Sequence, residues 1–372
     1  MEAFSLPVEP FNGTWVNCVN NNLISILMNH DKNFAYATCL AQAQYQLHSV
    51  ADDGSQEAAE HSSQAHEEGS LLLDVVRALD FSSVLDLQTH SLEPADSVHL
   101  AIKQFLHSGY YVFVDLDRFH YPSGVDAEKH RQIHPAFLYG YDEQTKSYLL
   151  IEDCMQPSKM EPYALPYDCF DRAFAAAQTS SLIVTRVKEQ EEVAFFSRCT
   201  KELISANLQT LLREECKPYK TDHAGNPLIS TTYGLSAIKQ FADSLETRLF
   251  GISLSKFQRK AVALKNPYFF RKSTVHLPLI LHKQNWVSEQ EFQQLSSEYQ
   301  TLCQEWELFG NSLIKCYYKS CYSKASTPAH QREIESLREL LGGMYEKEKR
   351  VASLTLELLT CSTASGQTGN FL

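Results

Sequence analysis

Three residue types in this chain could act together as a cysteine-based catalyst. Cys18 stands in the segment FNGTWVNCVNNNL, at the point where an apolar helical pattern begins. A thiol at the N-terminus of a helix faces unpaired backbone N–H groups and the positive end of the helix dipole, and both favour the thiolate. The sequence therefore predicts a nucleophile at Cys18, against the ordinary alternative of a small buried side chain at a helix start.

A base and an acid for this nucleophile stand in the middle of the chain. His134 begins the stretch HPAFLYGYD, Asp153 ends the stretch SYLLIED, and the polar residues EQTK join the two. This pattern predicts an antiparallel hairpin, in which the beginning of one strand lies beside the end of the next. We therefore expect His134 and Asp153 to form the base and orienting acid of a cysteine triad. The other candidates for the acid are Asp115, Asp117 and Asp142.

Asparagines surround the predicted nucleophile. Asn12 precedes Cys18 in the same segment and could direct its side-chain amide toward an oxyanion, together with the backbone N–H of Cys18. Asn17 and Asn20 are better interpreted as helix caps, because Asn is a preferred N-cap residue.

A metal site is the alternative use of the central histidines. Asp126, His130 and His134 recur at four-residue spacing, and His120 could be a fourth ligand if 125–134 were helical. Pro135 interrupts a helix there, and His134 cannot serve both roles. We therefore expect neither a metal nor a cofactor.

Several common motifs are absent. The sequence has no phosphate-binding G-x-x-x-x-G-K-[ST], no dinucleotide-binding G-x-G-x-x-G, no H-E-x-x-H and no G-x-S-x-G. Without a nucleotide site, the protein has no visible means of activating a carboxylate itself. A substrate for this cysteine would have to arrive already activated.

The elements that position these residues change in character along the chain. Helical patterns cover 19–30, continue into 41–48 and resume at 71–81 and 97–109, while 51–70 reads as a solvated loop. Strand patterns then dominate. Besides the hairpin, they are YYVFVDLD (110–117) and SSLIVTRV (180–187). From about residue 190 only helical patterns follow, so the sequence predicts an α+β fold with an all-α C-terminal region.

Composition sets the remaining limits. Hydrophobic residues make up 44% and charged residues 21% of the 372 residues, as in ordinary globular proteins. A net charge of −12 argues against nucleic acid as the main partner. No signal sequence or membrane-spanning stretch is visible, so we expect a cytoplasmic protein without membrane contact, whose ten cysteines are reduced.

The order of these residues resembles that of a known enzyme group. A helix-capping cysteine after an amide residue, followed by a histidine at a strand start, is similar to the papain-like bacteriocin-processing peptidases. More specifically, VNCVNNNLISIL, VDLDRFHYP and IHPAFLYGYD resemble the butirosin biosynthesis protein H family, with residues 1–187 covered. The peptidases carry Gln where this chain has Asn12, and Asp-Cys-Gly where it has Asn17-Cys18-Val19.

The resemblance implies an activity. That family and the related amide synthase of closthioamide biosynthesis are protease-fold acyltransferases of antibiotic and other natural-product biosynthesis. They move an acyl group from the phosphopantetheine thioester of an acyl or peptidyl carrier protein to an amine. We therefore expect a papain-like catalytic domain at 1–188, a helical domain for substrate or carrier docking at 189–361 and a disordered tail at 362–372. The alternatives are a cysteine peptidase or thioester hydrolase with the same triad, and a non-catalytic scaffold.

One segment predicts where a carrier would dock. Residues 255–272, SKFQRKAVALKNPYFFRK, contain no acidic residue in a chain of net charge −12. Carrier proteins of this kind are generally acidic, so a basic segment could steer one toward the site. A solvated helix face is the ordinary alternative. The basic residues are Lys256, Arg259, Lys260, Lys265, Arg271 and Lys272.

Overall fold

The chain folds into two compact units that interrupt each other in sequence. The computed structural model describes residues 3–50, 72–92, 97–188, 194–221, 227–250, 254, 257, 263–322 and 328–364. The first unit consists of Met1–Ala37 and Leu79–Arg198, and the second of Thr38–Ala78 and Cys199–Leu372. This division differs from the predicted boundary at residue 188, because a segment of the N-terminal half belongs with the C-terminal half.

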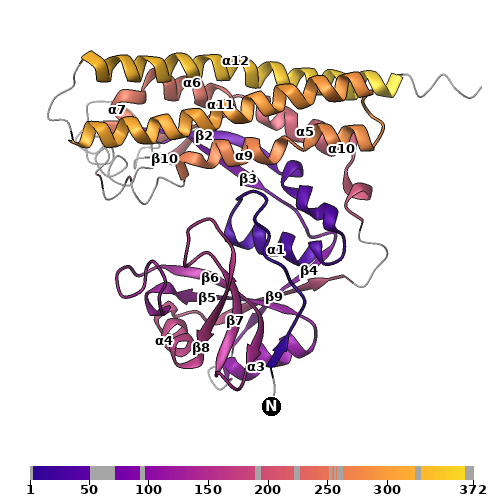
Figure 1. Ribbon diagram of the computed structural model, residues 1–372, viewed down its shortest axis with the longest axis vertical. Coiled ribbons are helices and arrows are strands. Elements are labelled where there is room, and N and C mark those ends of the chain that lie inside the picture. Colours follow the sequence, from indigo (N-terminus) through magenta and orange to yellow (C-terminus); the bar gives the residue numbers. More distant parts are fainter. Residues whose placement is uncertain are drawn as a thin grey trace, which may run out of the picture. The chain divides into compact units, whose positions relative to one another are not determined.

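The first unit is built on a seven-stranded antiparallel sheet with the order β4-β9-β5-β6-β7-β8, and β1 pairs with β6 at one end (Figure 1). Its strands are β1 (Ala3–Ser5), β4 (Leu85–Ser91), β5 (Tyr111–Asp117), β6 (Ile133–Asp142), β7 (Ser147–Glu152), β8 (Glu161–Pro166) and β9 (Ser181–Val187). Its helices are α1 (Cys18–Met28), α3 (Val98–His107) and α4 (Tyr167–Ala177), with short 3₁₀ turns η1 (Lys32–Leu40, which continues into the second unit), η2 (Arg118–His120) and η3 (Phe196–Arg198). The strands predicted at 110–117, 134–142, 147–153 and 180–187 are confirmed to within a residue or two.

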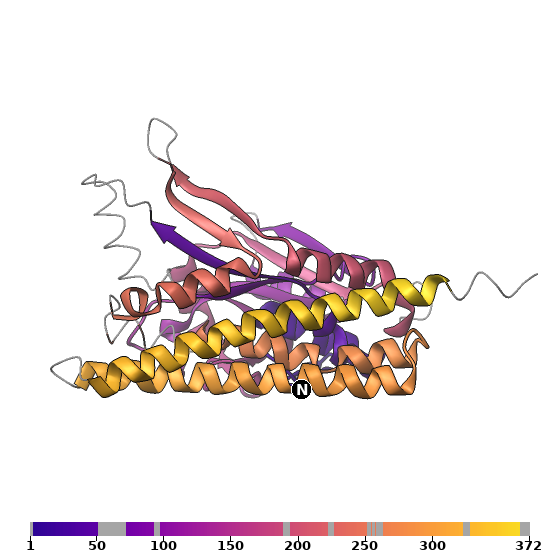
Figure 2. The ribbon, with the colours of Figure 1, turned by 90° about the horizontal axis from the view of Figure 1, so that it is seen from above.

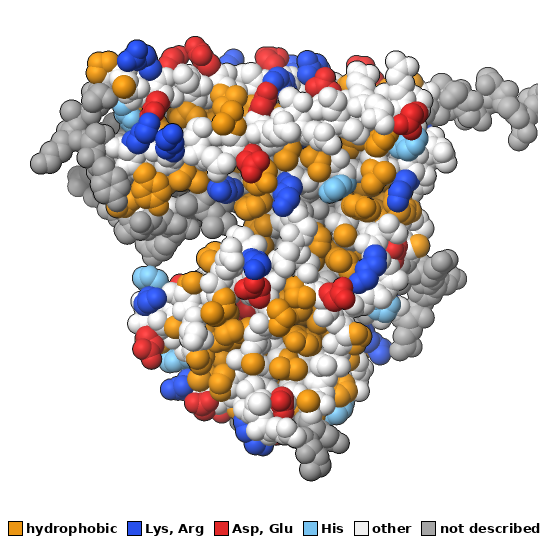
Figure 3. Space-filling view, viewed as in Figure 1, with side chains coloured by type: hydrophobic (Ala, Val, Ile, Leu, Met, Phe, Trp, Pro, Cys, Tyr) orange, Lys and Arg blue, Asp and Glu red, His pale blue; other side chains and the backbone are white. Residues whose placement is uncertain are grey.

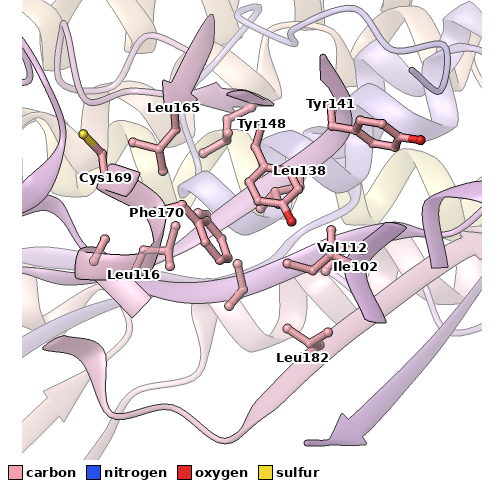
Figure 4. Close-up of a cluster of buried hydrophobic side chains, with 14 of the residues drawn as sticks. Ile102, Val112, Leu116, Leu138, Tyr141, Tyr148, Leu165, Cys169, Phe170 and Leu182 are labelled. Carbon is pink, nitrogen blue, oxygen red and sulfur yellow. The ribbon is translucent and has the colours of Figure 1, made fainter. Parts of the chain in front are cut away.

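The main core of the first unit lies between the sheet and the helices α3 and α4. Figure 4 shows Phe170 of α4 among Leu116, Leu138 and other side chains of the sheet. These side chains stand at alternate positions of β5 and β6, as expected where one face of a strand is buried. Ile102 and Leu106 of α3 join the same cluster. This packing fixes the sheet that carries the candidate site.

The hairpin of β6 and β7 contains one irregularity. Gly140 pairs with Leu149, whereas Leu138 pairs with Leu150, so Tyr139 is an extra residue in β6. This is the pattern of a β-bulge, which changes the face of the sheet to which the following side chains point. The bulge lies next to the place where β1 joins the sheet, because Ser5 pairs with Gly140.

The second unit combines a four-stranded antiparallel sheet, of order β10-β11-β2-β3, with a layer of helices (Figures 1 and 2). The strands are β2 (Gln42–Val50), β3 (Asp74–Ala78), β10 (Glu215–Thr221) and β11 (Pro227–Tyr233). The helical elements are α5 (Lys201–Leu212), α6 (Ser236–Asp243), α7 (Leu245–Phe250), η4 (Ala263–Lys265), α9 (Asn266–Thr274), α10 (Leu277–Lys283), α11 (Glu289–Tyr322) and α12 (Pro328–Ala364).

This sheet corrects three predictions. The sequence favours helices at 41–48 and 71–81, but β2 occupies most of the first range and β3 the middle of the second. The C-terminal region is not all-α, because it contributes β10 and β11.

The fold class α+β is confirmed. The predicted tail at 362–372 is wrong at its start, because α12 continues to Ala364, and 365–372 lie outside the described residues.

A buried ion pair holds the second unit together. The Glu348 carboxylate of α12 pairs with the Arg271 guanidinium of α9, and both side chains are almost completely buried. Glu348 also accepts hydrogen bonds of 2.5 Å from the Tyr45 hydroxyl and 2.7 Å from the Trp306 indole N–H. One carboxylate therefore ties β2, α9, α11 and α12 together.

Among the described residues, no helix combines the length and the apolar character that crossing a membrane requires.

Candidate active site

The predicted nucleophile lies where the sequence places it, at the first residue of α1. Asn17 is the N-cap, and its side-chain oxygen accepts a hydrogen bond of 2.8 Å from the backbone N–H of Asn20. The Cys18 thiol is partly exposed. The helix therefore presents Cys18 at its positive end, with the cap interaction provided by a neighbour rather than by the cysteine.

Buried asparagine fixes the segment that leads to the cysteine. The Asn21 side chain accepts a hydrogen bond of 3.0 Å from the Val16 N–H and donates to the carbonyl oxygens of Phe11 and Thr14. Ser25, one turn further on, accepts from the Phe11 N–H at 2.9 Å. Asn21 and Ser25 thus hold the loop that precedes Cys18 against the helix.

Asn12 does not occupy the predicted oxyanion role. Its side-chain nitrogen donates to the Met160 carbonyl oxygen at 2.8 Å, and its side-chain oxygen accepts from the Met160 N–H at 2.8 Å. Both polar atoms of the amide are engaged with the backbone of one residue. This corrects the expected orientation of Asn12, whose side chain fastens the loop around Met160.

His134 lies between Cys18 and a buried carboxylate. Its Nδ1 is 3.6 Å from the Glu152 Oε2 atom, and its side chain also interacts with the Cys18 thiol. Burial lowers the pKa of His134, but the interactions with Cys18 and Glu152 outweigh that effect and raise the pKa from 6.5 to about 9. The imidazole of His134 therefore interacts with both the Cys18 thiol and the Glu152 carboxylate.

The carboxylate beside His134 belongs to Glu152, not to the predicted Asp153. Asp153 accepts hydrogen bonds from the Arg118 guanidinium at 2.5 Å and from the Ser158 N–H at 3.1 Å. Glu152 is almost completely buried, whereas Asp153 follows the end of β7. In the structure His134 therefore pairs with Glu152, while Asp153, which the sequence predicts as the orienting acid, is bound to Arg118 and Ser158.

The bulge at Tyr139 explains this difference. Side chains alternate between the two faces of a strand, so a regular hairpin counted from its turn would put His134 and Asp153 on the same face. The extra residue in β6 reverses the alternation beyond it. Glu152 takes the face that His134 occupies, and Asp153 follows beyond the end of β7.

Arg118 connects the two neighbouring carboxylates. Its Nη2 atom donates to both Glu152 and Asp153, and the Arg118 side chain is almost completely buried. Although burial opposes the charge, the two carboxylates raise the pKa of Arg118 further above its usual value. A permanent cation therefore lies beside Glu152, the carboxylate that also pairs with His134.

Several polar atoms around this site lack a hydrogen-bond partner among the described residues. They include His134 Nδ1, Glu152 Oε1, Asn22 Oδ1 and the Tyr121 hydroxyl. Tyr121 is 1% exposed, and burial followed by the charge of Glu152 raises its pKa well above the usual value. Unsatisfied buried polar groups are rare in folded proteins, and both His134 and its carboxylate partner Glu152 carry one.

The other sequence candidates lie elsewhere. Asp117 is buried and accepts from the N–H groups of Phe119 and Gln132, so it shapes the loop between β5 and β6. Asp142 accepts from the Gln144 N–H in the turn of the β6–β7 hairpin, and Asp115 is exposed on β5. None of these three carboxylates forms an ion pair with His134 within 4.0 Å in the described part of the chain.

The alternative metal site requires a helix that the structure does not contain. Residues 125–129 form turns, and β6 begins at Ile133. A different group meets the distance requirement for a metal, because ligand atoms of His134, Glu152 and Asp153 lie within 4.8 Å of one another. Arg118 already supplies the positive charge between the two carboxylates of that group.

Sequence reasoning missed Glu152, Arg118 and Tyr121. Glu152 was missed because of the bulge. In a hairpin without an extra residue, Asp153 and not Glu152 would share a face with His134. Arg118 and Tyr121 follow directly after β5 in DLDRFHYP, where a strand that ends near His134 must place them close to it. That adjacency is the signal that could have indicated Arg118.

Comparison with known proteins adds no assignment. No protein-family model matches the sequence, and no curated protein matches it significantly.

Proposed function

We propose that this protein is a cysteine-dependent acyltransferase that forms an amide bond. The observation that carries the proposal is the group of Cys18, His134 and Glu152, with the cysteine at the start of a helix and the glutamate buried beside Arg118. The geometry suits nucleophilic catalysis at an acyl carbon. The acyl donor is proposed to be a thioester on the phosphopantetheine arm of a carrier protein, and the acceptor a small amine.

In the first half-reaction, Cys18 attacks the thioester carbonyl carbon as a thiolate. Backbone N–H groups at the start of α1 stabilise the negative oxygen of the tetrahedral intermediate. The intermediate collapses by breaking the bond to the pantetheine sulfur, which takes the proton held by His134. The product is an acyl-Cys18 thioester.

In the second half-reaction, the amine attacks the acyl-Cys18 carbonyl carbon. His134 removes a proton from the attacking nitrogen, and the bond to Cys18 breaks, which returns the cysteine as a thiolate. Glu152 fixes the imidazole orientation and stabilises its cation. Exchange between two thioesters is nearly balanced and aminolysis of a thioester is downhill, so this sequence of steps consumes no nucleotide.

A papain-like arrangement is part of the proposal. In papain-like enzymes, a nucleophilic cysteine begins a helix and the histidine stands at the start of a strand of an antiparallel sheet. Here Cys18 begins α1 and His134 stands at the start of β6. We propose a cytoplasmic enzyme of natural-product biosynthesis on the strength of the sequence resemblance.

The predicted carrier-docking segment needs revision. Arg271 is buried in its ion pair with Glu348, so it cannot contact a carrier protein. Lys256, Arg259 and Lys260 lie outside the described residues, and Lys265 and Lys272 are half-buried. On the face shown in Figure 3, basic side chains are interspersed with acidic ones over the long helices. Carrier docking at this segment therefore stays a prediction that depends on Lys256, Arg259 and Lys260.

The experiment that tests the function is a donor screen read by intact mass. The protein is incubated with a set of acyl-pantetheine thioesters, and an amine is then added. We expect a mass increase equal to the acyl group, absent in Cys18→Ala, that the amine removes with formation of an amide. An adduct removed only by water would indicate a hydrolase, and no adduct with any donor would favour the scaffold; either result overturns the proposal.

A further inference from the structure

A second group of reactive side chains lies in the second unit, between α11 and α12. The Cys316 Sγ atom on α11 is 4.0 Å from the His330 Nδ1 atom on α12. Ligand atoms of Cys316, His330 and Glu333 all lie within 4.8 Å of one another. Cys316 is 2% exposed and His330 is 9% exposed, so two of the three side chains are sheltered from solvent.

The helices bring these residues together by simple periodicity. His330 and Glu333 stand three positions apart on α12 and therefore share one face of that helix. Figures 1 and 2 show α11 and α12 side by side at the end where the chain passes from one helix to the other. Cys316 lies near that end of α11 and faces the pair.

We propose that Cys316, His330 and Glu333 bind one zinc ion. Thiolate, imidazole and carboxylate are the protein ligands that zinc prefers, and three protein ligands with an open fourth position are a common arrangement. Ligand atoms roughly 2.0–2.3 Å from the ion stand about 3.5 Å apart in a tetrahedron. The observed 4.0 Å between Sγ and Nδ1 is therefore close to the separation that binding needs.

Zinc binding would replace the ion pair of Glu333 and the proton of the Cys316 thiol. The Glu333 carboxylate pairs with Lys319, but these side chains are 41% and 48% exposed, and such surface pairs are worth only about 0–1 kcal/mol. Burial, followed by the charge of Glu333, raises the pKa of Cys316 to about 11. Zinc therefore binds with release of the thiol proton, and its affinity should fall as the pH falls.

A groove between α11 and α12 borders the proposed site. Cys316 and Glu333 line this groove, whose volume is about 410 Å³. Lys315 and Arg332 also line it, so an anionic ligand or water would be favoured at the open position. The site would thus cross-link α11 and α12 while keeping one coordination position accessible.

Cobalt titration of the metal-free protein tests this proposal directly. Cobalt(II) occupies zinc sites and gives a thiolate-to-metal absorption in the near ultraviolet. We expect one equivalent to bind with that absorption, and an equal amount of zinc to remove it. Cys316→Ser should abolish the absorption, and Glu333→Gln should weaken binding at least about tenfold, as loss of a coordinating group requires.

Two controls make the result specific. Cys303→Ser changes another partly sheltered cysteine of α11 and should leave the titration unchanged. Cys18→Ala should also leave it unchanged, which separates this site from the candidate active site. The proposal fails if the wild-type protein shows no thiolate absorption, or if the absorption survives Cys316→Ser. If Cys316→Ser does not fold, unchanged binding in Glu333→Gln overturns the proposal in its place.

Discussion

The two units each bury an arginine between helices or strands with carboxylate partners, but they complete these networks differently. In the second unit, Arg271 donates twice to Glu348, whose carboxylate also accepts from Tyr45 and Trp306. In the first unit, Arg118 also meets a buried glutamate, yet Glu152 Oε1 and Arg118 Nε lack hydrogen-bond partners among the described residues.

The difference separates a network with all its carboxylate oxygens bonded from one with an unused acceptor. A fully satisfied buried ion pair fixes one arrangement of its neighbours and offers nothing to a substrate. A buried carboxylate with unused acceptor capacity can follow an imidazole as its charge changes during a reaction. In the first unit, Glu152 therefore keeps an acceptor atom that a changing neighbour could use. In the second unit, both carboxylate oxygens of Glu348 are already bonded.

The largest effect is expected at Cys18, the proposed nucleophile of the first unit. Cys18→Ala should lower amide formation by roughly 10³-fold or more, because Cys18 is the group proposed to form the acyl intermediate. The free energy of unfolding should change by less than about 1 kcal/mol, since the site is partly exposed. Initial rates with an acyl thioester donor measure the loss. Cys216→Ala, at an exposed cysteine, is the matched control and should keep full activity.

Disrupting the Arg271–Glu348 network of the second unit should instead lower stability. Glu348→Gln leaves the buried Arg271 charge without its counter-charge, which we expect to lower the free energy of unfolding by about 3–5 kcal/mol. Urea denaturation measures this. Glu298→Gln breaks the more exposed pair with Arg350 and should cost about 1 kcal/mol or less. Equal losses in the two variants would contradict the structural role of Glu348.

A single-residue comparison tests which carboxylate orients His134. Glu152→Gln keeps the shape of the side chain but removes its charge, so kcat/KM should fall by about 10²-fold or more. Asp153→Asn changes the neighbouring carboxylate, which binds Arg118 and the Ser158 N–H, and should cost less than about tenfold. If Asp153→Asn proves the more damaging variant, the assignment of Glu152 is wrong.

The smallest effect is a pH dependence of stability. The pKa of His134 is raised from 6.5 to about 9 in the folded protein, so protonated His134 stabilises the fold fully below about pH 6.5. That contribution should be lost as the pH rises through about 9. The measurement is the difference in the free energy of unfolding between wild type and His134→Gln, with a slope of at most about 1.4 kcal/mol per pH unit. A difference that does not vary between pH 6 and 10 would rule out this linkage.

Local patterns in the sequence predicted the parts of the site that depend on local structure. The helix start at Cys18, the strand start at His134 and the stop of α3 near Gly109 all follow from neighbouring residues, and the structure confirms them. Glu152 could not be predicted in the same way. Its orientation depends on the bulge at Tyr139, and no local residue pattern marks that position.

Distant pairing explains the other errors. Residues 42–50 contain helix-compatible Ala and Gln residues, but they form β2 because β11 and β3 pair with both of its edges. The partner strand β11 lies far along the chain, so tertiary pairing overrides the local preference. Asn12 was misassigned for a similar reason, because its partner Met160 comes from a remote loop.

The sheet of the second unit also determines when that unit can form. During synthesis, β2 and β3 leave the ribosome long before β10 and β11, and the whole segment Leu79–Arg198 of the first unit is made in between. Until β11 arrives, one edge of β2 is unpaired, and such edges are prone to pair with other chains. Closing so long a loop is slow. A fragment that starts at Cys199 would carry the β10–β11 hairpin without β2 and would not be an independent helical domain.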